Sequence, residues 1–87
     1  MMADEKKISR LLKTARGQLD GILKMVEENR YCIDISQQLM ATEAILNRAN
    51  KEILAAHLQH CVQCVASEEE REAKIDEFVS TLDRILK

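Results

Sequence analysis

The chain has no proline and no tryptophan, and it has one tyrosine, one phenylalanine and two glycines among 87 residues. β-Strands need more β-branched and aromatic residues, and turns need glycine and proline, so this composition argues against a β-rich fold. Leucine, isoleucine, alanine, glutamate, lysine and glutamine, which favour helices, dominate instead. The sequence therefore predicts an all-α fold, with one domain over residues 1–87 at most.

Long apolar runs are also missing. No run approaches the roughly 20 residues that cross a membrane, and no signal peptide is recognisable. We therefore expect a cytoplasmic protein without a membrane partner. The three cysteines cannot all pair with one another, and cytoplasmic thiols stay reduced. Metal binding or thiol chemistry is consequently favoured over a structural disulfide.

The net charge of −2 hides an asymmetry along the chain. Residues 1–30 carry seven basic and five acidic side chains, whereas residues 61–87 carry four and seven. The N-terminal excess is a weak cationic patch, which alone is modest evidence for nucleic-acid binding.

Apolar residues recur at steps of three and four over three segments, which predicts three helices. The first runs from about Asp4 to about Glu28. The second begins near Cys32, and nothing stops its pattern before about Val65. The third is expected to begin after Ser67, because Ser67 followed by Glu70 is a capping-box signature.

Gly17 and Gly21 lie one turn apart in the first predicted helix. They either weaken the helix by about 1 kcal/mol each or permit the close approach of another backbone. The second interpretation is favoured.

The second predicted helix is too long for one small domain. More than 30 residues at 1.5 Å each give roughly 50 Å, whereas a compact globule of this length is about 30 Å across. The ends of this helix therefore need cover from another chain. We infer an obligate homo-oligomer, most simply an antiparallel pairing of two such helices about a two-fold axis near residues 45 and 46.

Residues 57–64, "HLQHCVQC", hold two histidines and two cysteines. On one helix Cys32 and His57 would be about 37 Å apart, so they cannot share a metal within one chain. In the antiparallel pair, residue 32 of one chain lies beside residues near 59 of the other. His57 and Cys61, one helical turn apart, are placed to hold one ion together. The expected site is Cys32 of one subunit with His57 and Cys61 of its partner.

Simpler interpretations of these residues stay open on spacing alone. A lone cysteine in a helix is more often a small apolar residue, and a lone histidine on an apolar face is more often a satisfied core residue. "CVQC" has no second pair to complete a zinc ribbon. His60 and Cys64 are candidate additional ligands.

Four segments together resemble the copper-sensing transcriptional repressor family of the CsoR type. They are "ARGQLDGILKMVE", "YCIDISQQL", "LNRAN" and "HLQHC", and the resemblance covers nearly the whole chain. It implies a three-helix protomer with a long central helix, which forms an antiparallel helical dimer and then a tetramer, a dimer of dimers. It also implies that the metal-free form binds double-stranded operator DNA and that copper(I) releases it.

The resemblance carries over to individual residues. It implies that Cys32, His57 and Cys61 are the metal ligands. It also matches Tyr31 and Glu77 to positions that hydrogen-bond the far side of the ligand histidine. Exposed surface residues are the alternative for these two.

For DNA binding the resemblance points to Arg16 and Arg48, and we add Arg10 and Lys13 from the same basic surface. The family usually has an arginine where this chain has Leu11, with Arg10 one place earlier. Details of the operator contact are expected to differ accordingly.

Two thiols and one imidazole are soft donors, and three-coordination suits copper(I). Zinc(II) would need a fourth ligand from His60, Cys64 or water, which leaves a zinc-responsive relative as an alternative. A persulfide sensor using Cys32 and Cys61 is another. An enzyme is disfavoured, because the sequence shows no glycine-rich loop and no carboxylate pair in separated environments.

Overall fold

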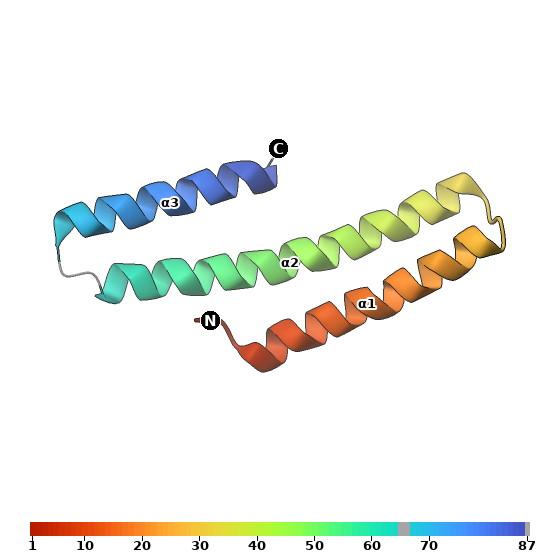
Figure 1. Ribbon diagram of the computed structural model, residues 1–87, viewed down its shortest axis with the longest axis horizontal. Coiled ribbons are helices and arrows are strands. Elements are labelled where there is room, and N and C mark those ends of the chain that lie inside the picture. The colour runs from red at the N-terminus through yellow and green to blue at the C-terminus, as the bar shows by residue number, and fades with distance from the viewer. Residues whose placement is uncertain (65–66, 87) are drawn as a thin grey trace. The chain divides into compact units, whose positions relative to one another are not determined.

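The computed structural model describes the backbone of residues 1–64 and 67–86, and the side chains of residues 1–60 and 67–85. These residues form three helices, α1 (Glu5–Glu27), α2 (Cys32–Cys64) and α3 (Glu68–Leu86), and no strand (Figure 1). The predicted all-α, three-helix protomer with a long central helix is therefore confirmed. Among the described helices, none is both long and apolar enough to cross a membrane.

The chain forms two compact units. One is Asp4–Asn50, which holds α1 and the first part of α2, and the other combines Met1–Ala3 with Lys51–Lys87. Within the Asp4–Asn50 unit, α1 and α2 run antiparallel on either side of a short turn (Figure 1).

The two ends of α1 are set by local hydrogen bonds. At its start, the Asp4 side chain accepts from the Lys6 N–H at 3.0 Å, and this satisfies a donor that has no partner within the helix. At its end, Asn29 adopts φ of 53°, a left-handed conformation that asparagine tolerates better than most residues. The Arg30 N–H then donates to the Met25 carbonyl at 3.0 Å, as in a Schellman motif, and the chain turns toward α2.

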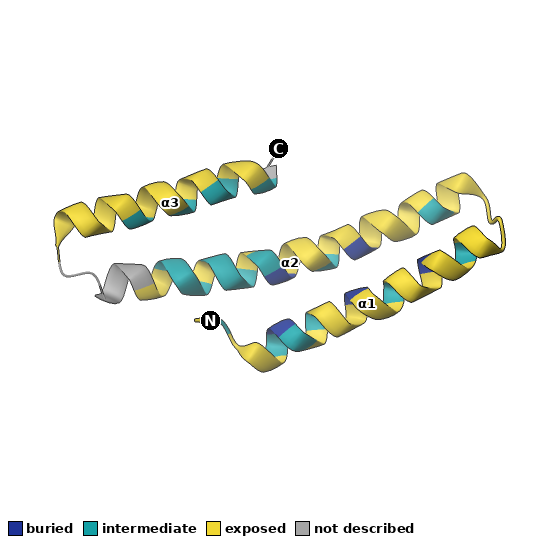
Figure 2. Ribbon diagram, in the orientation of Figure 1, coloured by how far each residue is buried: buried dark blue, intermediate teal, exposed yellow. Residues whose placement is uncertain are grey.

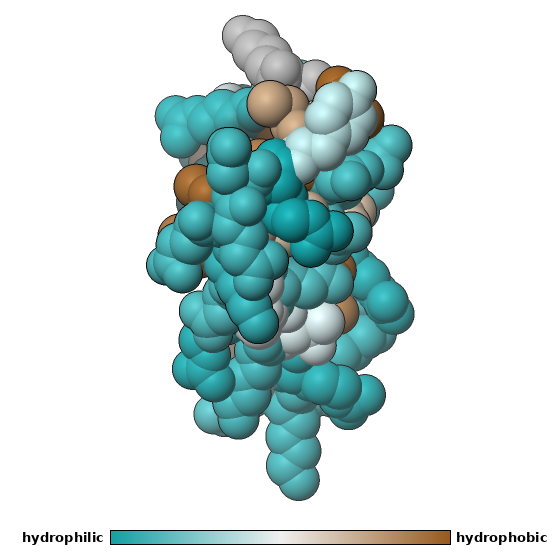
Figure 3. Space-filling view, turned by 90° about the vertical axis from the view of Figure 1, so that its right-hand side faces the viewer, coloured by the Kyte–Doolittle hydropathy of each residue, from teal (hydrophilic) through white to brown (hydrophobic). Residues whose placement is uncertain are grey.

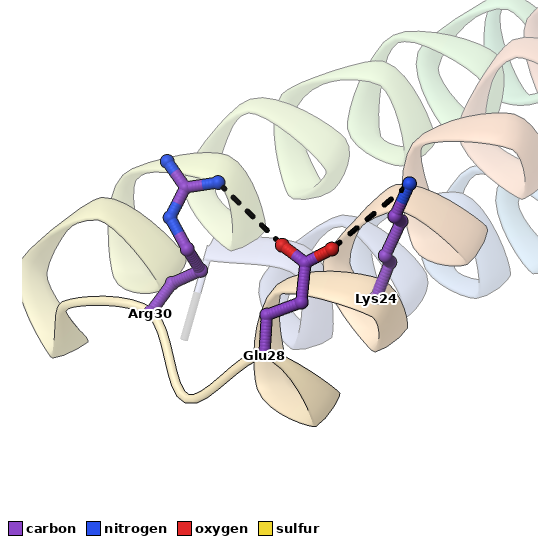
Figure 4. Close-up of polar contacts among 3 residues, drawn as sticks. All are labelled: Lys24, Glu28 and Arg30. Atoms are coloured by element: carbon purple, nitrogen blue, oxygen red, sulfur yellow. Dashed lines mark ion pairs between the residues drawn. The ribbon is translucent and has the colours of Figure 1, made fainter.

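The side chains around this turn are polar and add little to its stability. Glu28 lies 4.0 Å from Lys24 and 3.9 Å from Arg30 (Figure 4), and all three side chains are exposed. Exposed ion pairs of this length contribute little, because water and salt screen them. Hydrophilic side chains also dominate the face of the molecule seen in Figure 3. The backbone hydrogen bonds therefore define the turn.

The buried residues of the Asp4–Asn50 unit follow a seven-residue spacing. They are Ile8, Ala15 and Ile22 on α1, with Thr42 and Ala49 on α2 (Figure 2). Seven residues make nearly two helical turns, so each set lies along one side of its helix. The buried seam is narrow and partly lined by alanine, so much of each helix surface stays uncovered.

Thr42 is the one polar residue in this seam among the described residues, and it is only 2 % exposed. Its Oγ1 lies 2.8 Å from Oε1 of Gln18 on α1 and 3.1 Å from the Gln38 carbonyl on its own helix. A buried hydroxyl without a partner would be costly, so these acceptors make its burial possible. The contact with Gln18 also ties α1 to α2 in one register.

We expect Thr42→Val to lower the free energy of unfolding by about 1 kcal/mol, because it keeps the shape of the side chain and removes the inter-helix hydrogen bond. Urea unfolding at fixed protein concentration measures this change. Thr14→Val is the matched control, since Thr14 is exposed and bonds only the Arg10 carbonyl of its own helix, at 2.9 Å. Equal unfolding midpoints for the two variants would show that the Thr42–Gln18 bond adds nothing.

In the second unit, α3 begins as the sequence predicts. The Ser67 Oγ accepts from the Glu70 N–H at 3.1 Å, and acidic residues occupy the first turn, where the positive end of the helix dipole favours them. Phe78 and Leu82 of α3 face the last part of α2 across an open groove of about 590 Å³. Apolar side chains of both helices line this groove, so it is incompletely filled within the protomer.

Candidate metal and DNA-binding sites

Cys32 is the first residue of α2, and it is exposed and not in a disulfide. The turn that ends α1 places it there, directly after Tyr31, whose side chain is 68 % exposed. A thiol in this position is accessible to a metal ion or to another subunit.

His57 and His60 lie near the C-terminal end of α2. His57 is half-buried, whereas His60 is exposed and lines a small hollow of about 170 Å³ with Met2, Ala56 and Gln59. Cys61 and Cys64 belong to the last turn of α2, and their side chains lie outside the described residues.

Within the described part of the protomer, no three His, Cys, Asp or Glu side chains form a group that could hold a metal. The predicted three-ligand site is one that a single chain is not expected to complete, because it draws Cys32 from one subunit and His57 with Cys61 from the other. The ligand set therefore stays a prediction.

Glu77, the other predicted partner of His57, lies on the exposed surface of α3. Its carboxylate is 3.8 Å from the Lys74 Nζ, and its carbonyl accepts from the Thr81 Oγ1 at 2.9 Å. The pair with Lys74 is a weak surface contact that Glu77 can exchange for another donor. The hydrogen-bonding roles of Tyr31 and Glu77 toward His57 stay predictions.

The four predicted DNA-binding residues are all exposed. Arg10, Lys13 and Arg16 lie on α1, and Arg48 lies on α2. A shallow hollow of about 440 Å³ beside the start of α1 is lined by Glu5, Lys6, Ser9, Arg10 and Lys13.

Lys6, which belongs to the cationic patch of residues 1–30 but was not among the predicted DNA contacts, lines this hollow beside Arg10 and Lys13. Its spacing to Arg10 and Lys13, four and seven residues, is the signal that identifies it. Leu11, where the sequence resemblance leads us to expect an arginine, is half-buried. Its side chain contributes to packing, and the neighbouring Arg10 supplies the exposed charge.

A second surface of the Asp4–Asn50 unit is apolar and uncovered. On α1 it comprises Leu12, Leu19, Leu23 and Val26, which are 44–60 % exposed, and on α2 it includes Leu39 and Leu46, which are 48 % and 43 % exposed. Cys32, Leu39 and Leu46 follow one another at seven-residue steps. The exposed thiol therefore begins an exposed apolar stripe on α2.

The sequence pattern of the metal-sensitive transcriptional repressor family matches residues 4–84. The chain belongs to this family. The CsoR-type resemblance is thereby confirmed, and so is the expectation that the protein is no enzyme, since this is a family of repressors.

Copper-sensing repressors are among the relatives to which the chain is similar. The copper-sensing transcriptional repressor CsoR of Mycobacterium ulcerans is 42% identical over 71 residues, 82% of this chain and 61% of the relative. CsoR of Bacillus subtilis is 32% identical over 84 residues, 97% of this chain and 83% of the relative. The chain thus spans about three fifths of the mycobacterial relatives it matches.

Two solved structures of metal-responsive regulators share the fold. The copper-sensing repressor CsoR with Cu(I) from Geobacillus thermodenitrificans superposes with a TM-score of 0.81 at 36% identity, covering 94% of this chain and 85% of that one. The nickel-responsive regulator InrS superposes with a TM-score of 0.79 at 29% identity, covering 98% and 96%. Family membership therefore establishes the fold and the general class of protein, a metal-sensitive transcriptional repressor. The metal that is sensed differs between these relatives.

Proposed function

We propose that this protein is a copper(I)-responsive transcriptional repressor. Its metal-free form binds double-stranded operator DNA, and copper(I), held by Cys32 of one subunit with His57 and Cys61 of the partner subunit, weakens that complex. The observation that carries the proposal is that Cys32 and His57 belong to one continuous helix in a chain of the metal-sensitive repressor family.

If Cys32 and His57 bind one ion, the length of α2 requires them to come from two subunits. Twenty-five residues of α-helix correspond to about 37 Å, whereas a metal holds its ligands within about 2.3 Å. His57 is eleven residues, close to three full turns, beyond Leu46. Cys32, Leu46 and His57 therefore share one side of α2, and an antiparallel partner brings opposite ends of that side together.

A second copy of the chain is the occupant we assign to the exposed apolar stripe. Large apolar side chains left at 43–60 % exposure on α1 and α2 favour association, because covering them removes apolar surface from water. The stripe on α2 begins at Cys32, so the same contact that buries Leu39 and Leu46 would also complete the metal site. A dimer of dimers, as the sequence resemblance implies, is the proposed assembly.

The donor set favours copper(I). Two thiolates and one imidazole are soft ligands, and three-coordination is suited to this ion. Zinc(II) prefers four ligands, which would require His60, Cys64 or water. Nickel(II), sensed by InrS, favours square-planar sites with more nitrogen and oxygen donors. The three ligands would hold copper(I) between α2 of one subunit and α2 of the other.

The response of the protein to the metal requires contacts that differ between the metal-bound and metal-free states. We assign this role to His57, with Tyr31 and Glu77 as hydrogen-bond partners of the ring nitrogen that faces away from the metal. Glu77 pairs with Lys74 at 3.8 Å in the structure, on the exposed surface of α3, so it can change partners at low cost.

The exposed thiol of Cys32 supports one further candidate, a persulfide-sensing repressor. In that case Cys32 and Cys61 of the partner subunit would become joined through sulfur, and His57 would not be needed. The two candidates differ in whether copper(I) or polysulfide releases the DNA.

The deciding experiment is an anaerobic titration of the protein–DNA complex. Duplex DNA selected by the wild-type protein from a randomised pool serves as the operator, and fluorescence anisotropy follows its release. We expect release at one copper(I) per protomer and none with zinc(II) or nickel(II) at the same ratio. If copper(I) leaves the complex intact, the proposed function is wrong.

We expect Arg48→Ala to weaken operator binding and to make the salt dependence of log K shallower by about one unit for each phosphate that the variant no longer binds. Arg48 is exposed and lies close to the proposed two-fold axis, so one substitution removes several charges from the assembled surface. Arg71→Ala is the matched control, because Arg71 is an exposed arginine beside the acidic first turn of α3. Equal affinity and slope for both variants would show that Arg48 makes no phosphate contact.

A further inference from the structure

One exposed face of α1 carries basic residues together with two glycines, which have no side chain. Its residues are spaced by three or four positions and lie within an arc of about 80°, since each residue turns the helix by about 100°. They are Lys6, Arg10, Lys13, Gly17, Gly21 and Lys24, all exposed. The hollow beside Lys6, Arg10 and Lys13 continues this basic face toward the start of the helix.

Among the described residues of the protomer, nothing requires glycine at the two central positions. A Cβ built on Gly17 or on Gly21 meets no described atom within 4 Å apart from its chain neighbours and the nearby backbone of α1, and neither residue has a positive φ. The sequence-based expectation of a close backbone approach is therefore not met inside one chain. Glycine in a helix costs about 1 kcal/mol relative to alanine, so two glycines weaken α1 without any return in packing. The missing side chains are relevant only to a molecule that approaches α1 from outside.

The positive charge of this face of α1 indicates which kind of molecule approaches it. Four cations, Lys6, Arg10, Lys13 and Lys24, lie on the same face as the glycines. Two acidic residues are close to this face: Asp20 lies at its edge, and the Glu28 carboxylate lies 4.0 Å from the Lys24 Nζ. The same face of a second copy would bring like charges together. The exposed apolar residues Leu12 and Leu19, which suit another subunit, lie about 140° and 160° around the helix from Gly17.

We propose that Gly17 and Gly21 let the backbone of α1 lie directly against a phosphate strand of the operator, between the cations at Arg10 and Lys13 on one side and Lys24 on the other. A missing Cβ shortens the distance between strand and helix, and the flanking cations then reach more than one phosphate. This inference rests on the proposed DNA-binding function and adds the two positions that set how closely the DNA approaches.

The test compares Gly17→Ala, Gly21→Ala and the double variant with Lys13→Met, using the duplex selected by the wild-type protein. We expect the alanine variants to unfold at the same or a higher temperature and to keep the wild-type mass in sedimentation. Their operator affinity should fall, about tenfold in the double variant, and the salt slope should become shallower because the flanking cations then reach fewer phosphates. Lys13→Met keeps the bulk of the side chain and removes its charge, so its affinity and its salt slope should both fall.

Three results would overturn this inference. Wild-type affinity in the double alanine variant, with weakened binding by Lys13→Met, would remove the glycines from the interface and leave the proposed function standing. A smaller sedimenting mass would show that the glycines serve contact with another subunit. Absence of DNA binding by the wild-type protein would defeat the proposed function itself, and this inference with it.

Discussion

Cys32→Ala is expected to abolish the copper response while operator affinity stays within about twofold of wild type, as for a surface change outside the DNA contacts. Cys32 is exposed at the start of α2. The proposed DNA contacts are instead the exposed cations of α1 and Arg48. Its removal leaves one thiol and one imidazole on the partner subunit, and these two donors no longer link two subunits. Anaerobic anisotropy titration of the complex with copper(I) measures the response.

Cys64→Ser is the matched control for this prediction. It removes a thiol from the same helix but leaves the proposed ligand set of Cys32, His57 and Cys61 complete. We expect it to release DNA at one copper(I) per protomer, as the wild type does. Release of the Cys32→Ala complex at that ratio would show that the metal site does not span the subunits. Loss of the response in Cys64→Ser would instead place a fourth ligand in the site.

The fold could be predicted closely because its signals are local. The period of the apolar residues and the side-chain caps at Asp4 and Ser67 depend on neighbours within a few positions, and the helix bounds agree with them to within about one residue. The Thr42–Gln18 bond was not predicted. It joins residues 24 positions apart. The spacing of apolar residues in the sequence does not indicate that the Thr42 hydroxyl donates to the Gln18 side chain.

The candidate sites could be predicted less completely. The spacing of Cys32, His57 and Cys61 indicated that two chains are needed, because helix length sets a distance that no single metal spans. The same reasoning cannot give the positions of the partner's side chains, since these depend on an interface that forms between copies. Leu11 shows another limit. Leu11 is half-buried and Arg10 beside it is exposed, but burial alone does not identify a DNA contact.

His57→Ala is expected to separate copper sensing from sulfur sensing. Copper(I) loses its third donor and its proposed link to Tyr31 and Glu77, so residual binding to the two thiols should no longer release DNA. Polysulfide needs only the two thiols. It supplies the oxidising sulfane sulfur, so Cys32 can form a persulfide that the partner's Cys61 attacks, with hydrosulfide leaving. The variant should therefore ignore copper(I) but still form an inter-subunit crosslink, seen in non-reducing gel electrophoresis.

The crosslinking measurement is best made in a Cys64→Ser background, because Cys64 lies three residues from Cys61 in the last turn of α2 and could pair with it locally. His60→Ala is the matched control, since it removes an exposed imidazole from the same turn and leaves the proposed ligands intact. Release of the His57→Ala complex at the wild-type copper(I) concentration would show that the imidazole is no ligand. A wild-type complex that ignores copper(I) and is released by polysulfide alone would assign the protein to sulfur sensing, because two thiols then suffice for the response.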